Sequence, residues 1–203
     1  GAQVARQIMS SKLREFEKRH EFAHFQHRKG EMVGGTVKRI ELGSPVIDLG
    51  KGEGFLPRRS MIPRENFRVG DHVKAYIEDV CQDPKGYQVI LSRVHNQFLV
   101  QLFAQESMEI YDGIVQIRAI ARDPGSRTKI VVDSQDPSID PVRVCVGVRG
   151  SRVQAVIREL CGEKIDIIAW QDDIVTLVAE ALKPAVVSKV IVNDRNVLDI
   201  VVP

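Results

Sequence analysis

The stretch Gly147-Val148-Arg149-Gly150 is the part of this 203-residue sequence whose residue types point most directly to chemistry. Two glycines around two other residues let a backbone turn sharply and come close to a ligand. Ser151 and Arg152 follow at the start of a predicted helix, whose unpaired N–H groups and positive end face the turn. With Arg143 nearby, these residues predict a cradle with cationic walls that could hold a phosphate. The same short pattern also occurs in turns that bind nothing.

Other phosphate-binding and catalytic patterns fit the sequence less well. The turn lacks the Gly-Lys-Ser/Thr of a P-loop and does not follow a strand, so kinase or GTPase activity is not supported. Asp172-Asp173, and Asp136 with Asp140, look like paired acids, but each lies where a helix starts or a turn closes, which favours capping over acid–base catalysis. We therefore predict that the protein is not an enzyme and has no catalytic residues.

Metal and disulfide chemistry is not indicated either. The cysteines are odd in number and never spaced as CxxC, which favours reduced, small apolar side chains. They are Cys81, Cys145 and Cys161. His20, His24 and His27 fall on one face of a predicted helix, but no carboxylate or thiol completes a metal-binding set. We expect neither a metal nor a cofactor.

The composition limits where a nucleic acid could bind. The formal net charge is only +2, so such affinity must come from a local basic surface rather than from an overall field. No apolar run reaches membrane-spanning length and no signal peptide opens the sequence, so we expect a cytoplasmic protein without membrane contact. The length suits two compact domains and part of a third.

Residues 1–95 predict a helix followed by a small barrel. Apolar residues recur at helical intervals within residues 1–29, which predicts an amphipathic linker helix. Short strands and glycine turns fill residues 30–95 and predict a five-stranded barrel of the OB type. The expected strands are Met32 with 35–40, 45–49, 54–57, 72–80 and 87–92.

The barrel offers weaker binding candidates than the glycine turn. OB barrels bind RNA through basic faces with aromatic stacking platforms, although an aromatic residue beside a strand more often belongs to the core. The candidates are Phe55, Phe67 and Tyr76, with Lys38, Arg39, Arg58, Arg59, Arg64 and Arg68. Because charges across the barrel nearly balance, its own RNA affinity is expected to be weak.

The remaining sequence repeats one pattern. Residues 96–171 predict a helix, two strands, a helix and a strand, the order of a type II (bacterial) KH domain, with the glycine turn between helical segments. Residues 172–203 restart with a helix at 174–182 and strands at 187–192 and 196–202 across an Asn193-Asp194 turn. A truncated second KH unit is expected there, with a sheet that lacks a strand. The predicted class is therefore α+β with several domains.

Several longer runs resemble the NusA family of bacterial transcription factors. They are residues 62–68, 121–127, 139–142, 145–156 and 163–167. The resemblance implies an S1-type OB barrel and two KH domains, with residues 1–29 ending a polymerase-binding N-terminal domain that is otherwise absent. It also implies a monomer whose partners are single-stranded RNA, RNA polymerase (mainly through that N-terminal domain) and other Nus factors. The stretches 43–46 and 55–58 lack the aromatic and histidine set common in S1-type barrels, so base stacking is not carried over.

Three functions remain open at this point. The preferred hypothesis is the RNA-binding portion of a bacterial transcription elongation factor, acting in pausing, termination and antitermination by contacting single-stranded nascent RNA. The alternative is an RNA-binding appendage of an RNA-degradation complex, although the barrel precedes the KH domain here and polynucleotide phosphorylase carries its KH domain first. In a more remote reading the glycine turn is only a turn, and the protein is an interaction scaffold.

Overall fold

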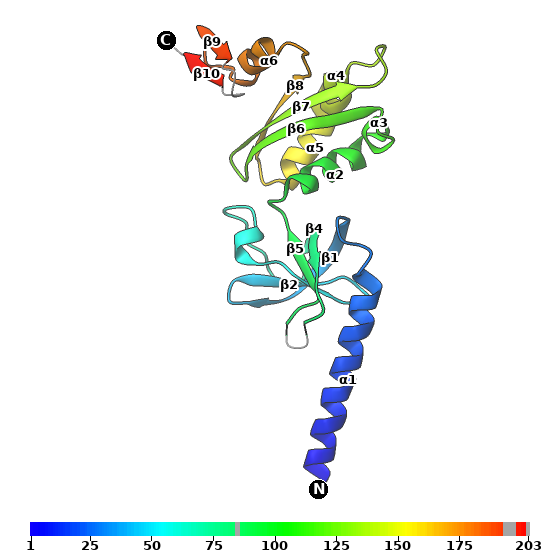
Figure 1. Cartoon of the computed structure of the whole chain (residues 1–203). Coiled ribbons are helices and arrows are strands. Elements are labelled where there is room, and N and C mark those ends of the chain that lie inside the picture. The colour runs from blue at the N-terminus through cyan, green and yellow to red at the C-terminus, as the bar shows by residue number, and fades with distance from the viewer. Residues whose placement is uncertain (84–85, 193–197, 202–203) are drawn as a thin grey trace. The chain divides into compact units, whose positions relative to one another are not determined.

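The structure, a computed structural model, describes residues 1–83, 86–192 and 198–201 (Figure 1). The chain divides into two compact units, residues 1–102 and 103–203. The chain contains both helices and strands, and the predicted α+β class with more than one domain is confirmed.

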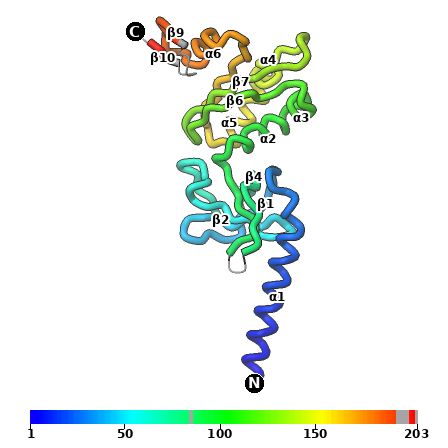
Figure 2. Tube along the Cα trace, viewed as in Figure 1, coloured from blue at the N-terminus to red at the C-terminus, as the bar shows by residue number. Residues whose placement is uncertain are grey.

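The chain begins with the long helix α1, Ala2–Phe25, which confirms the helix predicted within residues 1–29. Its last residue, Phe25, is fully buried in the barrel core. The opposite end extends beyond the barrel (Figure 2), and Ile8 and Leu13 there are exposed. The helix is therefore fixed to the barrel through its C-terminal end.

A closed five-stranded barrel follows, as predicted, with strand order β1-β2-β3-β5-β4. The strands are β1 (Met32–Glu41), β2 (Ser44–Asp48), β3 (Glu53–Phe55), β4 (His72–Val80) and β5 (Val89–Ser92). The pair β3–β5 is parallel, whereas the other pairs are antiparallel. At Gly35 a Cβ atom would lie 2.3 Å from the carbonyl oxygen of Asp48, so glycine is what allows β1 and β2 to cross closely.

A buried ion pair holds the β3–β4 connection, which we define as residues 57–71. Arg93 Nη2 lies 2.7 Å from Glu65 Oε1, and only 4% and 2% of these two side chains are exposed. Glu65 also accepts a hydrogen bond from the backbone N–H of Ile62 at 3.0 Å, and the backbone N–H of Arg93 donates to the carbonyl of Ser60 at 2.8 Å. The short 3-10 helix η1, Arg58–Ser60, lies within this connection.

The next elements have the predicted KH order. They are α2 (Asn96–Glu106), α3 (Met108–Tyr111), β6 (Val115–Asp123), β7 (Arg127–Ser134), α4 (Pro141–Val146), η2 (Val148–Gly150), α5 (Ser151–Glu159) and β8 (Lys164–Ala169). The sheet order is β6-β7-β8, with β6–β7 antiparallel and β7–β8 parallel. Helix α4 packs against β7 and β8, and α5 packs against β8. The short helix α3 was not predicted.

A second buried ion pair fixes the β6–β7 turn. Arg122 Nε lies 2.9 Å from Glu163 Oε1, and both side chains are fully buried. Glu163 also accepts hydrogen bonds from the Thr128 hydroxyl and, at 2.8 Å, from the backbone N–H of Gly125. Gly125 has a φ of 78°, and the backbone N–H of Ser126 donates to the carbonyl of Asp123 at 3.0 Å, which closes the turn.

The last described elements are α6 (Ile174–Ala181), β9 (Lys189–Val192) and β10 (Leu198–Val201). The two strands pair antiparallel. Lys129 Nζ donates to the carbonyl oxygens of Ala181 and Lys183, at 2.5 and 2.7 Å. The predicted Asn193-Asp194 turn lies outside the described residues, and the assignment of 172–203 to a truncated second KH unit stays a prediction.

Candidate nucleic-acid interface

The turn at residues 147–150 joins two helices through backbone conformations that favour glycine. Helix α4 ends at Val146, and Gly147 has φ 75° and ψ 177°. Arg149 follows with φ 53° and ψ 29°, and Gly150 with φ 78° and ψ 13°. Three of the four residues therefore have positive φ, which reverses the chain within one short turn. The sequence prediction of a sharp glycine turn is confirmed.

The two glycines are required for different reasons. A Cβ atom on Gly147 would lie 2.6 Å from Arg152 Cγ and 3.0 Å from the backbone nitrogen of the same residue. Its φ and ψ also fall in a region that is essentially restricted to glycine. A Cβ atom on Gly150 would meet nothing closer than 4.0 Å, and its left-handed conformation is one that Asn and Asp tolerate. Space at Gly150 is therefore open on the side where a ligand could approach.

The start of α5 supplies hydrogen-bond donors and a positive field. Gly150 is its N-cap residue, and no side chain caps this end. The first N–H groups of a helix lack partners within the helix, and the helix dipole places partial positive charge there. An open groove beside the turn includes Val142, Val146, Gly147 and Ser151 in its lining. An anion in this groove would meet the helix end directly.

Two of the three predicted arginines project into solvent beside the turn. Arg149 is exposed, as is its neighbour Val148, at 82%. The Arg143 side chain is 88% exposed and lies 3.3 Å from Asp140, a pairing that water screens strongly. Both guanidinium groups are free to contact a phosphate. Ser151 is exposed at the same end of α5.

Arg152 lies differently from the other predicted site residues. Its Nη1 donates to the carbonyl of Val144 at 2.9 Å and reaches Ser107 Oγ and Glu109 Oε2, both at 3.4 Å. The pKa of Glu109 is lowered by a hydrogen bond from the backbone N–H of Glu109 itself, then by the Ser107 hydroxyl and by the charge of Arg152. Arg152 therefore braces the end of α4 against α3, and its contacts indicate a positioning role rather than a cationic wall.

The candidate acids and the thiol of this unit have structural roles. Asp140 caps α4 by accepting from the backbone N–H groups of Val142 and Arg143, and Asp173 caps α6 in the same way. These contacts confirm the capping interpretation for both residues. Cys145 is the buried residue of α4, and burial raises the pKa of its thiol to about 12, so the reactive thiolate is disfavoured.

The aromatic candidates of the barrel already have partners inside it. Phe55 stacks on Tyr87 with ring centroids 4.7 Å apart, and Tyr76 stacks on His95 at 4.5 Å. Phe67 packs against the core and lies under the guanidinium of Arg93 at 5.7 Å. The sequence did not identify these pairings, because the partner residues are distant along the chain. The rings are half-buried, so the structure favours packing over base stacking for all three.

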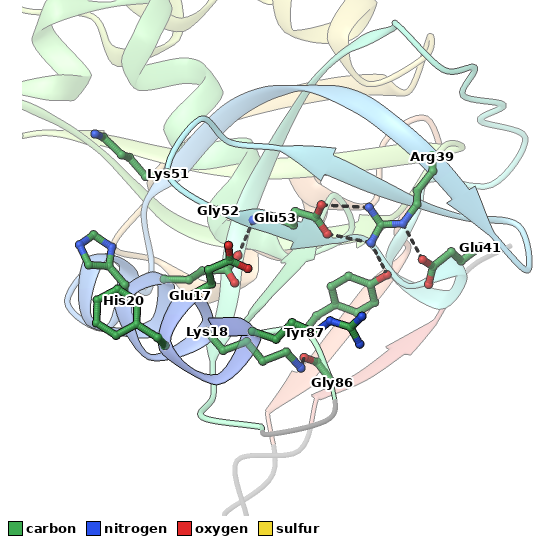
Figure 3. A pocket seen from close by; sticks show the side chains of 13 residues that line it. Glu17, Lys18, His20, Arg39, Glu41, Lys51, Gly52, Glu53, Gly86 and Tyr87 are labelled. Carbon is green, nitrogen blue, oxygen red and sulfur yellow. Dashed lines mark hydrogen bonds and ion pairs between the residues drawn. The ribbon is translucent and has the colours of Figure 1, made fainter. Parts of the chain in front are cut away.

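Basic candidates of the barrel fall into two groups. In the groove between α1 and the barrel, Arg39 is ion-paired with Glu53 at 2.7 Å and also bonds Glu41 and Tyr87 (Figure 3). Lys38 is likewise ion-paired with Glu53, at 2.8 Å. Arg58, Arg59, Arg64 and Arg68 are instead exposed on the β3–β4 connection. Among the described residues, no cluster of three or more His, Cys, Asp or Glu side chains could hold a metal, and no helix is long and apolar enough to cross a membrane.

Two family profiles match consecutive parts of the chain. Residues 26–93 match the profile described as S1 RNA binding domain, and residues 93–170 match the one described as NusA-like first KH domain. The chain is therefore of the class that joins an S1-type barrel to a KH domain. The solved structure of a multidomain protein with nucleic acid binding domains from Streptococcus pneumoniae also aligns with this chain. The alignment covers 64% of this chain and 42% of that protein, at 12% sequence identity and a TM-score of 0.28, values too low to support an argument about the fold.

Curated relatives narrow the class to one family. The chain is 45% identical to the transcription termination/antitermination protein NusA of Rickettsia conorii, over 99% of this chain and 41% of that protein. Proteins of the same name from Halalkalibacterium halodurans and Bacillus subtilis are 44% and 42% identical over 96% of this chain, and 51% and 53% of their own lengths are covered. The chain belongs to the NusA family, as the resemblance predicted. It spans roughly half of the length of these relatives.

Proposed function

We propose that this chain is an RNA-binding segment of a bacterial transcription elongation factor that acts in pausing, termination and antitermination by holding single-stranded nascent RNA. The turn at residues 147–150 supports this proposal most, because an uncapped helix start lies next to a glycine-lined open space. KH domains clamp about four nucleotides at such a turn. The name of the relatives, transcription termination/antitermination protein, supports the role in transcription. A nascent bacterial RNA lies in the cytoplasm. RNA polymerase and other Nus factors would be partners of the whole protein.

The proposed binding mode uses backbone first and charge second. The N–H groups at the start of α5 would donate to one phosphate, and the positive end of the helix would stabilise its charge. Arg149 and Arg143 would contact neighbouring phosphates from the two sides of the turn. Contacts of this kind position a strand without reading its bases, so affinity should depend weakly on sequence.

The proposed role is to hold RNA rather than to cleave it. The carboxylates of Asp140 and Asp173 are used in helix caps, and the raised pKa of Cys145 disfavours a nucleophile beside the turn. RNA incubated with the purified protein and Mg²⁺ should therefore stay intact. Cleavage that follows the protein through purification would favour the alternative, an RNA-degradation appendage, which the names of the relatives do not favour.

A pair of variants at Gly150 tests the clamp. Gly150→Asp places a negative charge where phosphate would approach, whereas Gly150→Asn adds a side chain of the same shape without the charge. Both should fold, because a Cβ at this position meets nothing closer than 4.0 Å. We expect Gly150→Asp to lower the affinity for a single-stranded RNA of about 12 nucleotides at least tenfold, and Gly150→Asn to lower it about threefold or less. Circular dichroism checks folding, and a duplex of the same sequence should bind more weakly. Equal affinities for Gly150→Asp and the unchanged protein would refute the clamp.

A further inference from the structure

We propose that the β3–β4 connection of the barrel, residues 57–71, is a second RNA contact that binds the phosphate backbone through arginine side chains alone. The proposal rests on the proposed function, because it takes RNA as the ligand, and it adds a site on the other domain. The connection carries four arginines, Arg58, Arg59, Arg64 and Arg68, and two acidic residues, Glu65 and Asp71.

The two acidic residues do not neutralise these arginines. Glu65 is buried and paired with Arg93, which lies outside the connection. Asp71 accepts a hydrogen bond from the backbone N–H of Arg68 at 2.7 Å, which closes a turn and leaves the guanidinium of that arginine unengaged. Within the described parts of the chain, none of the four arginine side chains has an ion-pair partner.

Several other cations of the barrel and of the segment that leads into it are paired. Lys29 lies 2.8 Å from Asp79, and Arg28 lies 2.8 Å from Glu31. Lys38 is likewise paired, at 2.8 Å from Glu53. The charges of the barrel nearly balance in total, but they are distributed unevenly. Part of its surface carries cations in ion pairs, and the β3–β4 connection carries arginines without ion-pair partners among the described residues. Four unpaired arginines in one connection repel each other unless an anion is bound, so the arrangement favours a polyanionic ligand.

The connection holds these side chains on an ordered backbone. Ser60, Ile62 and Glu65 are buried and alternate with the exposed arginines. Backbone N–H groups of the connection are already used: Ile62 donates to Glu65, and Gly70 donates to the carbonyl of Val37 at 2.9 Å. An anion here would therefore meet side-chain guanidinium groups and few free main-chain donors. In Figure 1 the connection is the cyan segment that leads from β3 to β4.

The chemistry of the connection fits phosphate better than an acidic protein. The planar guanidinium group binds phosphate with two parallel hydrogen bonds. Protein interfaces usually add buried aromatic or apolar anchors. In the connection, Ile62 is buried and Phe67 is half-buried beneath Arg93. Of its large apolar side chains, Val69 is exposed, at 67%. Arginines without an apolar centre are typical of sequence-independent contacts to a nucleic-acid backbone.

The test compares two variants with the same change in net charge. The first replaces Arg58, Arg59, Arg64 and Arg68 by Gln, and the control replaces the paired cations Arg19, Arg28, Lys29 and Lys38 by Gln. Affinity for a single-stranded RNA of about 15 nucleotides is measured at several salt concentrations. Each phosphate contact contributes about 0.7 to the log–log salt slope, so the first variant should lose up to about 2.8 in slope. Its affinity near 0.1 M salt should fall roughly tenfold or more relative to the control.

RNA length separates the two sites. A probe of about four nucleotides fills a KH clamp, so the four-arginine variant should bind it as the unchanged protein does, while Gly150→Asp should not. If Gly150→Asp binds both probes normally, the proposed clamp fails, and the salt slope with the longer RNA still reports on the connection. Equal slopes for the four-arginine variant and its control would overturn the second contact. So would a variant that loses affinity for polyglutamate but keeps its affinity for the longer RNA, because the connection would then serve an acidic protein.

Discussion

Two surface turns of this chain present arginine to solvent, and they are held in opposite ways. At residues 147–150 the backbone itself makes the turn, through glycines at φ 75° and 78° and an uncapped helix start. In the β3–β4 connection the backbone is fastened by side chains, above all by the buried pair of Glu65 and Arg93. The first turn leaves main-chain donors open, whereas the second uses many of its own internally.

The difference teaches how each turn could bind the same ligand. A phosphate at residues 147–150 would meet donors fixed in the backbone, so binding there depends on geometry and is sensitive to a Cβ atom added at Gly147. A phosphate on the connection would meet flexible charged side chains, so binding there divides into small increments that salt screens. Geometry-dependent and salt-dependent contributions should therefore separate between the two domains of this chain.

The largest expected effects come from breaking the buried ion pairs beneath these surfaces. Glu65→Ala removes the carboxylate that faces the buried guanidinium of Arg93 and should lower the free energy of unfolding of the barrel by about 3–5 kcal/mol. Glu163→Ala should do the same to the KH domain by removing the carboxylate that faces buried Arg122. Trp170, the sole tryptophan, lies in the second unit. Its fluorescence in urea should report the Glu163→Ala change, whereas circular dichroism should report both.

An exposed ion pair provides the control for the buried pairs. Glu31→Ala removes the partner of Arg28 at the surface and should change the free energy of unfolding by about 0.5 kcal/mol or less. If Glu65→Ala were as mild as Glu31→Ala, the connection would not depend on its buried pair, and the contrast between the two turns would disappear.

The next effect compares the two glycines of the KH turn. Gly147→Ala forces a Cβ atom against Arg152 in a backbone conformation that only glycine adopts readily, and should cost about 3 kcal/mol. Gly150→Ala stays in the left-handed region with open space around it and should cost about 1–2 kcal/mol. Urea unfolding and RNA affinity should both rank the variants in this order. The reverse order in RNA affinity, with both proteins folded, would mean that the ligand contacts Gly150 more closely than the geometry indicates.

A smaller effect distinguishes single arginines. Arg149→Ala should reduce the salt slope of RNA binding by about 0.7 and weaken different RNAs equally. Arg152→Ala should weaken binding with little change in slope, because this residue acts through Val144, Ser107 and Glu109 rather than on phosphate. Affinities at several salt concentrations decide both cases. Parallel plots with the same intercept for Arg149→Ala and the unchanged protein would show that Arg149 does not touch RNA.

The sequence predicted the features that depend on local pattern. The glycine turn at 147–150 and the helix start at Asp140 each follow from rules about neighbouring residues, and the structure confirms them. The five strands of the closed barrel followed from the number and spacing of short apolar runs, whereas their order in the barrel was not predicted.

Features that depend on distant partners could not be read in the same way. Glu65 and Arg93 are 28 residues apart and Arg122 and Glu163 are 41 apart, and nothing local marks a charge that will be buried. Arg152 looked like a neighbour of Arg149, yet on a helix adjacent residues point in different directions. The aromatic candidates were likewise ambiguous, because stacking partners such as Tyr87 and His95 become neighbours only when the barrel closes.

The smallest effect concerns acid, and it separates the paired cations of the barrel from the unpaired ones. Hydrogen bonds from Arg39, and then from Lys38, lower the pKa of Glu53 from 4.5 to about 2. Because the pKa is lower in the folded protein, this carboxylate stabilises the barrel above pH 4.5, and its contribution is lost as the pH falls from 4.5 towards 2. The group is partly exposed and water screens it, so we expect a contribution of only about 1 kcal/mol.

Glu53→Gln should remove this part of the acid dependence of the free energy of unfolding, measured in urea between pH 7 and pH 2.5. Replacing Arg58 and Arg64 by Gln should leave that dependence unchanged, because neither holds a carboxylate. An equal loss in both proteins would mean that the connection arginines are paired in solution, and their excess charge would no longer be available to RNA.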